Sequence, residues 1–111
     1  MSRITTHVLD TARGRPAVGV PVTLEVLYAG EWKTIGRART DADGRARALV
    51  DGDIEAGRYR LTFDTAAYFE SSGVEGFFPI AQIVFDVRDA RQPHHVPLLL
   101  SPFGYSTYRG S

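Results

Sequence analysis

The side chains best suited to chemistry in this sequence are three histidines, together with arginine, serine and tyrosine side chains near them. His7 lies near the start of the chain, and His94 and His95 are adjacent near its end. The absence of cysteine excludes disulfides, thiolate nucleophiles and cysteine-based zinc sites. An imidazole with an ordinary pKa of about 6.5 can take up and return a proton near neutral pH. Acid–base catalysis is therefore one chemistry open to these residues, but for any single histidine a solvated or merely hydrogen-bonded ring is the simpler interpretation.

Alternation in the flanking segments predicts where the histidine rings point. In ITTHVLD, His7 shares a face with Thr5 and Leu9, and this face is the more polar of the two. In HHVPLLLS, His95 has the opposite parity to the apolar residues that we expect to point into the core. Its neighbour His94 must therefore face the other way.

Two other uses of histidine find little support. The sequence has no HxH or HExxH spacing, two adjacent strand residues cannot easily bind one ion, and no carboxylate stands at ligand spacing from either. No metal ligand is therefore predicted. A Ser-His-Asp arrangement would need a nucleophile such as Ser101 or Ser106, but no GxSxG elbow marks one.

The composition limits the class of protein. With 111 residues the chain has the length of one domain, residues 1–111, and can bury a core without disulfides. Its 13 basic and 13 acidic residues give a net charge of zero, with no basic stripe for a nucleic acid. The sequence shows no apolar leader and no run of about 20 apolar residues, so we expect no membrane partner and a cytoplasmic location.

Hydrophobic residues alternate with polar ones along much of the chain, which is typical of half-buried strands. The clearest segments are 21–28, 58–63 and 81–87. Turn signals separate the segments at short intervals, among them Ala29-Gly30 and the Asp43-Gly44 pair that is typical of a hairpin. About eight strands are expected.

One segment breaks this alternation. Residues 64–73 begin with Asp64, a good helix N-cap, and end with Gly73, a common helix stop. A single short helix is predicted there. Regular short strands with one small helix indicate an all-β protein, a two-sheet β-sandwich.

Several motifs resemble one family over nearly the whole chain. THVLDTARGRPA at residues 6–17 and HVPLLLSPFGYSTYRGS at residues 95–111 resemble the two ends of the 5-hydroxyisourate hydrolases, the enzymatic branch of the transthyretin-like proteins. The spacing of TDADGRARALV and AGRYRLTFDTAAYF between them is also similar. The terminal Tyr-Arg-Gly-Ser, residues 108–111, is the most specific mark, because hormone-carrying transthyretins lack it.

The resemblance implies a transthyretin-like sandwich of eight strands, assembled as a homotetramer, a dimer of dimers, with a channel along the dimer–dimer contact. A strand over residues 105–109 would line a subunit contact and let the terminal tetrapeptide close the active site. The resemblance implies that the catalytic residues are His7, Arg45, His95 and Ser111, and that the substrate-binding residues are His7, Arg45, Tyr108, Arg109 and Ser111.

The implied reaction opens a ring of 5-hydroxyisourate with water, giving 2-oxo-4-hydroxy-4-carboxy-5-ureidoimidazoline in urate degradation. His7 and His95 would form the acid–base pair. Arg45 would offer a planar fork of donors to carbonyl oxygens or to a delocalised anion, and Ser111 a hydroxyl that contacts water or the ring. No cofactor is expected.

Two other functions remain open from the sequence. A non-catalytic carrier of small aromatic anions could use the same channel, but a carrier has no need of the histidine–arginine set and the terminal tetrapeptide. A structural or adhesive sandwich module would be expected beside linkers or a secretion signal. Neither feature is visible in this sequence.

Overall fold

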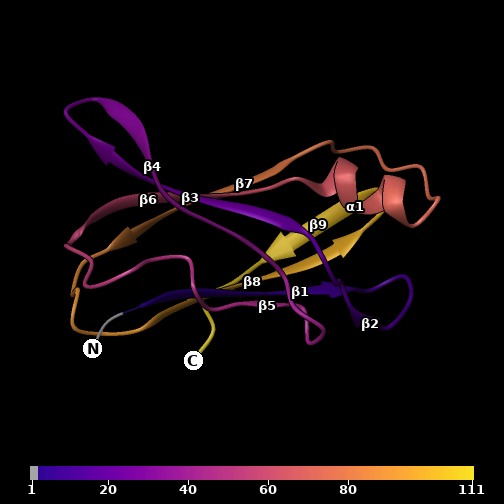
Figure 1. The fold of residues 1–111 in the computed structure, drawn as a ribbon, viewed down its shortest axis with the longest axis horizontal. Coiled ribbons are helices and arrows are strands. Elements are labelled where there is room, and N and C mark those ends of the chain that lie inside the picture. Colours follow the sequence, from indigo (N-terminus) through magenta and orange to yellow (C-terminus); the bar gives the residue numbers. More distant parts are fainter. Residues whose placement is uncertain (1–2) are drawn as a thin grey trace.

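The computed structural model describes residues 3–111, which form two β-sheets and one short helix (Figure 1). The predicted all-β, two-sheet sandwich is confirmed, with nine strands among these residues, two of them only two residues long. One sheet has the order β2-β1-β8-β9 with β5 also paired to β1, and the other has the order β4-β3-β6-β7. The strands of the first sheet are β1 (Ile4–Asp10), β2 (Arg15–Pro16), β5 (Arg45–Ala46), β8 (His94–Ser101) and β9 (Gly104–Thr107). Those of the second are β3 (Pro21–Tyr28), β4 (Glu31–Arg39), β6 (Gly57–Phe63) and β7 (Ala81–Val87).

The core lies between the two sheets, and the alternation seen in the sequence decides which side chains reach it. In β1, Ile4, Thr6 and Val8 are fully buried, whereas the residues between them are only half-buried. The buried set of β6 is Tyr59, Leu61 and Phe63 and that of β8 includes Val96, Leu98 and Leu100. The first sheet therefore turns its apolar face inward and its more polar face outward.

The central pair of the first sheet is parallel. β1 and β8 run side by side over seven registered pairs, from Ile4 with His94 to Asp10 with Leu100. All other strand pairs of the two sheets are antiparallel. This parallel pairing brings together the two segments that carry the histidines.

The predicted helix is present as α1 (Thr65–Ser71), next to one end of the sandwich in Figure 1. Asp64 is its N-cap, because its carboxylate accepts a hydrogen bond of 3.0 Å from the backbone N–H of Ala67. Gly73 follows with a φ of +67°, the left-handed conformation that commonly ends a helix. No helix among residues 3–111 is long and apolar enough to cross a membrane.

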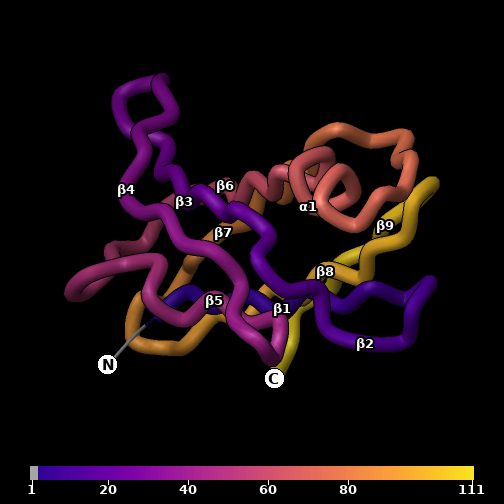
Figure 2. The backbone as a smooth tube through the Cα atoms, turned by 45° about the vertical axis from the view of Figure 1, so that its right-hand side comes forward, coloured from indigo at the N-terminus to yellow at the C-terminus, as the bar shows by residue number. Residues whose placement is uncertain are grey.

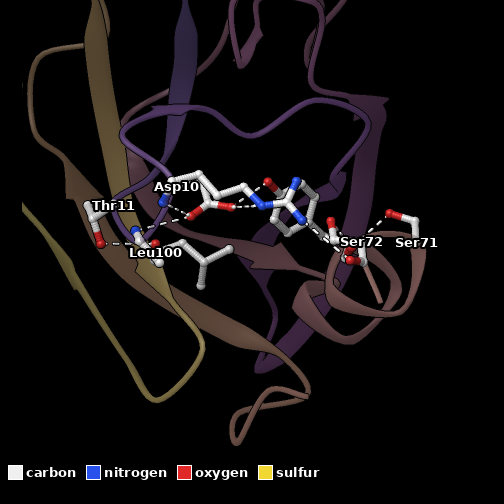
Figure 3. A network of polar contacts seen from close by, with 8 residues as sticks. Asp10, Thr11, Ser71, Ser72 and Leu100 are labelled. Carbon is white, nitrogen blue, oxygen red and sulfur yellow. Dashed lines mark hydrogen bonds and ion pairs between the residues drawn. The ribbon is translucent and has the colours of Figure 1, made fainter. Parts of the chain in front are cut away.

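A buried carboxylate fixes the end of β1 (Figure 3). Asp10 is 3% exposed and accepts hydrogen bonds from the Tyr68 hydroxyl of α1, at 2.7 Å, and from two backbone N–H groups of the following turn. Next to it, the backbone N–H of Thr11 donates to the carbonyl oxygen of Leu100, at 2.9 Å. The Asp10 contacts anchor the end of β1 to α1 and to the turn, and the Thr11 bond extends the pairing with β8.

Two local expectations need correction. The two-residue hairpin turn is Ala29-Gly30, with φ angles of 52° and 79°, whereas the Asp43-Gly44 pair lies in a turn between β4 and β5, which belong to different sheets. The strand expected over residues 105–109 is β9 and ends at Thr107. Regular pairing stops there because Tyr108 comes opposite Pro97 of β8, which has no N–H to donate. The same register resumes in one isolated bridge, where the N–H of Gly110 donates to the carbonyl oxygen of His95.

Candidate active site

The outer face of the first sheet gathers His7, Arg45 and His95. His7 of β1 and Arg45 of β5 are direct partners across an antiparallel pair, where opposite Cβ atoms lie about 5 Å apart. Thr5 of β1 is the registered partner of His95 in β8. Because Thr5 and His7 are two residues apart on one strand, roughly 7 Å, they point to the same face. All four of these side chains therefore meet on one polar surface, and each is only half-buried.

The His95 ring is held at two edges. Its Nδ1 atom lies 2.8 Å from the Thr5 hydroxyl oxygen. At the neighbouring edge, a Cβ atom added to Gly110 would stand 2.5 Å from Cδ2 of the ring, closer than atoms can approach. The tail residue Gly110 thus packs its bare backbone against the imidazole.

The surroundings keep His95 neutral. Burial lowers its pKa below the ordinary value, and the charges of Arg45 and His7 lower it further, while a hydrogen bond to the backbone of Thr5 partly opposes them. A lowered pKa leaves the ring unprotonated near neutral pH. The ring is then able to accept a proton from water.

His94 points to the opposite side of the sheet, as its parity predicts. It is 5% exposed and, among the residues that the structure describes, its Nδ1 atom is the one buried side-chain nitrogen or oxygen without a hydrogen-bond partner. Burial, and next the charge of Arg109, lowers its pKa. His94 also lines a cavity of about 240 Å³ between the two sheets.

Residues of the terminal tetrapeptide lie at both faces of the first sheet. Gly110, followed by the exposed Ser111, lies at His95. Tyr108, which is 56% exposed, and Arg109 line the cavity beside His94, and Arg109 donates to the side-chain oxygen of Gln92 at 3.4 Å. Both Figure 1 and Figure 2 place the end of the tail near β1 and β5.

Of the site residues expected from the sequence, the single chain thus brings His7, Arg45 and His95 together and leads the tail towards them. Tyr108 and Arg109 lie apart from this group. Sequence reasoning gave no role to Thr5 and none specifically to Gly110. The parity of ITTHVLD did place Thr5 on the face of His7, but only the strand pairing reveals that it meets His95.

Comparison with known proteins identifies the family to which this geometry belongs. The sequence profile of the HIUase/Transthyretin family matches residues 4–110, almost the whole chain. The chain belongs to this family. Within the HIUase/Transthyretin family, it is 45% identical to a 5-hydroxyisourate hydrolase of Caulobacter vibrioides, over 100% of both chains.

Solved structures of the HIUase/Transthyretin family match the fold. The 5-hydroxyisourate hydrolase of Klebsiella pneumoniae superposes with a TM-score of 0.88 at 42% identity, covering 100% of each chain. Sea bream transthyretin in complex with thyroxine superposes with a TM-score of 0.92 at 34% identity, covering 97% of this chain and 94% of the other. A 5-hydroxyisourate hydrolase and a thyroxine-bound transthyretin therefore both share the fold of this chain.

Proposed function

We propose that this protein hydrolyses 5-hydroxyisourate in urate degradation. The observation that carries the proposal is the grouping of His7, Arg45 and His95 on one face of the β5-β1-β8 sheet, with the tail packed against His95. This grouping occurs in a chain that is 45% identical to a 5-hydroxyisourate hydrolase over its full length. Sandwich packing alone would not require two histidines and an arginine on the outer, polar face.

His95 is the proposed general base. Its lowered pKa keeps it unprotonated at neutral pH, so it can take a proton from water as the water oxygen attacks a ring carbonyl carbon of the substrate. The carbon–nitrogen bond of that ring then breaks. The leaving nitrogen must receive a proton, and His7, on the same face, is the proposed donor.

Arg45 is the proposed donor to the developing oxyanion. Its strand partner is His7, so its guanidinium lies on the face where the reacting carbonyl would sit. The planar fork of N–H donors can bind an oxygen with two parallel hydrogen bonds and stays charged at every relevant pH. Stabilising the negative charge on that oxygen is expected to supply a large part of the rate enhancement.

The tail is proposed to complete the active site. Ser111 follows Gly110, which is bonded to His95, so its hydroxyl is within reach of a substrate held there. The substrate-binding roles of Tyr108 and Arg109 remain predictions. In the single chain these two side chains line the cavity beside His94. Such roles would therefore require that substrate binding, or contact with a neighbouring subunit, moves them towards His95.

We also propose that the protein assembles as a homotetramer, a dimer of dimers. Large apolar side chains lie exposed on the single chain, including Phe103, which is 70% exposed, and an edge-to-face pair of Phe78 and Tyr105. Exposed aromatic rings in contact, such as Phe78 and Tyr105, commonly mark a protein interface. Light scattering after size-exclusion chromatography would test the assembly, and a monomer would contradict it. A cytoplasmic location remains a prediction from the sequence.

The rival function is a carrier of small aromatic anions. A carrier needs the channel but no proton-transfer groups. The decisive experiment adds the purified protein to freshly prepared 5-hydroxyisourate and follows the loss of its ultraviolet absorbance. We expect a large acceleration over the spontaneous decay, and decay at the spontaneous rate would favour the carrier.

A further inference from the structure

We propose that Thr5 is a positioning residue for His95, with its hydroxyl oxygen accepting the Nδ1–H hydrogen bond so that the lone pair stays on Nε2. The proposal rests on the function proposed above, because it assigns the nitrogen with which His95 acts as a base. Thr5 itself touches no reacting atom in this proposal. It acts through the ring that it orients.

The contact between Thr5 and His95 is a product of the fold. The two residues are 90 positions apart in the sequence and are registered partners in the parallel pair of β1 and β8. Their side chains lie on the same outer face, and the Thr5 oxygen is 2.8 Å from Nδ1, an ordinary hydrogen-bond distance. At the far end of the same strand pair, the N–H of Thr11 donates to the carbonyl oxygen of Leu100, which continues this register.

The next residue offers a comparison within the same strand. Thr6 points inward, is fully buried, and its hydroxyl donates to the carbonyl oxygen of Val96. That bond links the backbone of β8 to β1 and satisfies a buried group, so it is structural. The hydroxyl of Thr5 lies on the opposite face and meets a titratable ring instead of a backbone carbonyl.

The direction of the Thr5 bond follows from the proton that His95 must carry. A neutral imidazole has one N–H and one lone pair, whereas the protonated ring donates from both nitrogens. If the Thr5 oxygen accepts from Nδ1–H, the bond remains intact when Nε2 takes up a proton. If the hydroxyl donated to Nδ1, Nε2 would already hold a proton and could not act as the base.

The other ring nitrogen is left free for this task. Among residues 3–111, no hydrogen bond reaches Nε2 of His95, and that atom is not among the buried side-chain nitrogens that lack a partner. Gly110 meanwhile lies against Cδ2, the ring carbon bonded to Nε2. Thr5 on one edge and Gly110 on the other thus hold the ring in one orientation, with Nε2 accessible beside the tail.

Nuclear magnetic resonance tests the tautomer without reference to activity. In protein labelled with ¹⁵N at histidine, the ring signals of His95 are assigned by their loss in His95→Gln. In the wild type at a pH where the ring is neutral, we expect Nδ1 to show the shift of a protonated nitrogen and Nε2 that of an unprotonated one. In Thr5→Val, which removes the hydroxyl at nearly constant volume, the Nδ1–H form should lose population. A wild-type ring protonated on Nε2, or a tautomer unchanged in Thr5→Val, would overturn the proposal.

Kinetics test the consequence. Thr5→Val should lower kcat at least about tenfold with little change in KM, as part of the roughly 10²- to 10⁴-fold that a general base supplies, and Thr5→Ser should restore most of the rate. Thr62→Val is the matched control, because it removes a half-buried strand hydroxyl that contacts Glu25 and Gln82 in the other sheet. Wild-type kcat in Thr5→Val, or an equal loss in Thr62→Val, would contradict the proposal.

Different results would contradict the proposed hydrolysis and the proposed role of Thr5. A wild-type protein that does not accelerate 5-hydroxyisourate decay removes the proposed function, while the ¹⁵N spectra still report whether Thr5 sets the tautomer. If Thr5→Val does not fold, the wild-type tautomer and the rate of Thr5→Ser still decide the question, since a slow Thr5→Ser with wild-type thermal stability would count against the proposal.

Discussion

His7 and Arg45 face each other across β1 and β5, the strand that follows the Asp43-Gly44 turn. β5 is only two residues long: its pairing with β1 buries Ala46 in the core and places Arg45 next to His7. The same face carries His95 on the other side of β1. The fixed positive charge of Arg45 thus lies on the same face as both imidazole rings.

Replacing either histidine of this face with alanine should greatly slow hydrolysis. His7→Ala and His95→Ala each remove a half-buried side chain from the outer face, so folding and assembly should change little. A general acid or base typically supplies about 10²- to 10⁴-fold. Steady-state rates with circular dichroism as the folding control measure the effect, and a loss below tenfold at either position would argue against the acid–base pair.

Arg45→Lys keeps the positive charge but loses the fork of donors. We expect kcat to fall clearly, on the order of tenfold or more, because an ammonium cannot hold an oxygen with two parallel hydrogen bonds. The acid limb of kcat/KM should move little, since the charge that lowers the pKa of His95 is retained. Wild-type turnover in Arg45→Lys would contradict the two-bond role.

Gly110→Ala should displace the His95 ring, because the new Cβ atom would meet Cδ2 at 2.5 Å. Activity should drop at least tenfold, since a shift of about 1 Å in a catalytic group is costly. Gly104→Ala is the matched control: its Cβ atom would find its nearest neighbour, the Ser101 hydroxyl, at an acceptable 3.8 Å. Equal activity of the two variants would show that the tail does not constrain the ring.

Deleting residues 108–111, or appending a tag after Ser111, should suppress hydrolysis. The tail runs along the edge of β8 as far as His95, so extra chain would have to leave through the site or pull Ser111 away from it. A tag before Met1 should be tolerated better. The two tagged proteins are compared at equal concentration, with size-exclusion chromatography as the assembly control, and equal rates would refute the closing role of the tail.

The buried residue His94 should make the stability of the fold decrease at acidic pH. Burial and the charge of Arg109 lower the pKa of His94 in the folded state, so below about pH 6.5 the unfolded chain binds more protons at this residue than the folded chain does. This contribution to stability is complete above the unfolded pKa and is lost as the pH falls. In urea titrations, the wild type should lose more stability between pH 7.5 and 5.5 than His94→Phe, whereas parallel curves would contradict this role of His94.

Local patterns in the sequence were sufficient for much of the site. Parity alone put His7 on the polar face and separated His94 from His95, and capping residues located α1. These features depend on neighbours a few residues away. The hydrophobic effect acts on them whatever the strand partners are, which is why they could be predicted.

Features that depend on strand partners were beyond reach of the pattern. The pattern of ITTHVLD does not predict that β1 pairs in parallel with β8, so the contact of Thr5 with His95 was missed. The Asp43-Gly44 pair has the sequence of a hairpin turn, yet the strands on either side join different sheets. The position of Arg109 beside His94 likewise depends on the pairing of the tail with β8, where the N–H of Gly110 donates to the carbonyl oxygen of His95.

The parallel pairing of β1 with β8 also sets when this protein can become active during its synthesis. Thr5 and His95 are separated by 90 residues, and a ribosome adds roughly 5 to 20 residues per second. His95 is therefore synthesised about 5 to 20 seconds after Thr5. Until then the nascent chain carries β1 without its central partner, with an unpaired edge open to misassociation. Contacts of such long sequence separation also form slowly. The emergence of residues 94–111 is therefore expected to be the step that both completes the first sheet and creates the catalytic face.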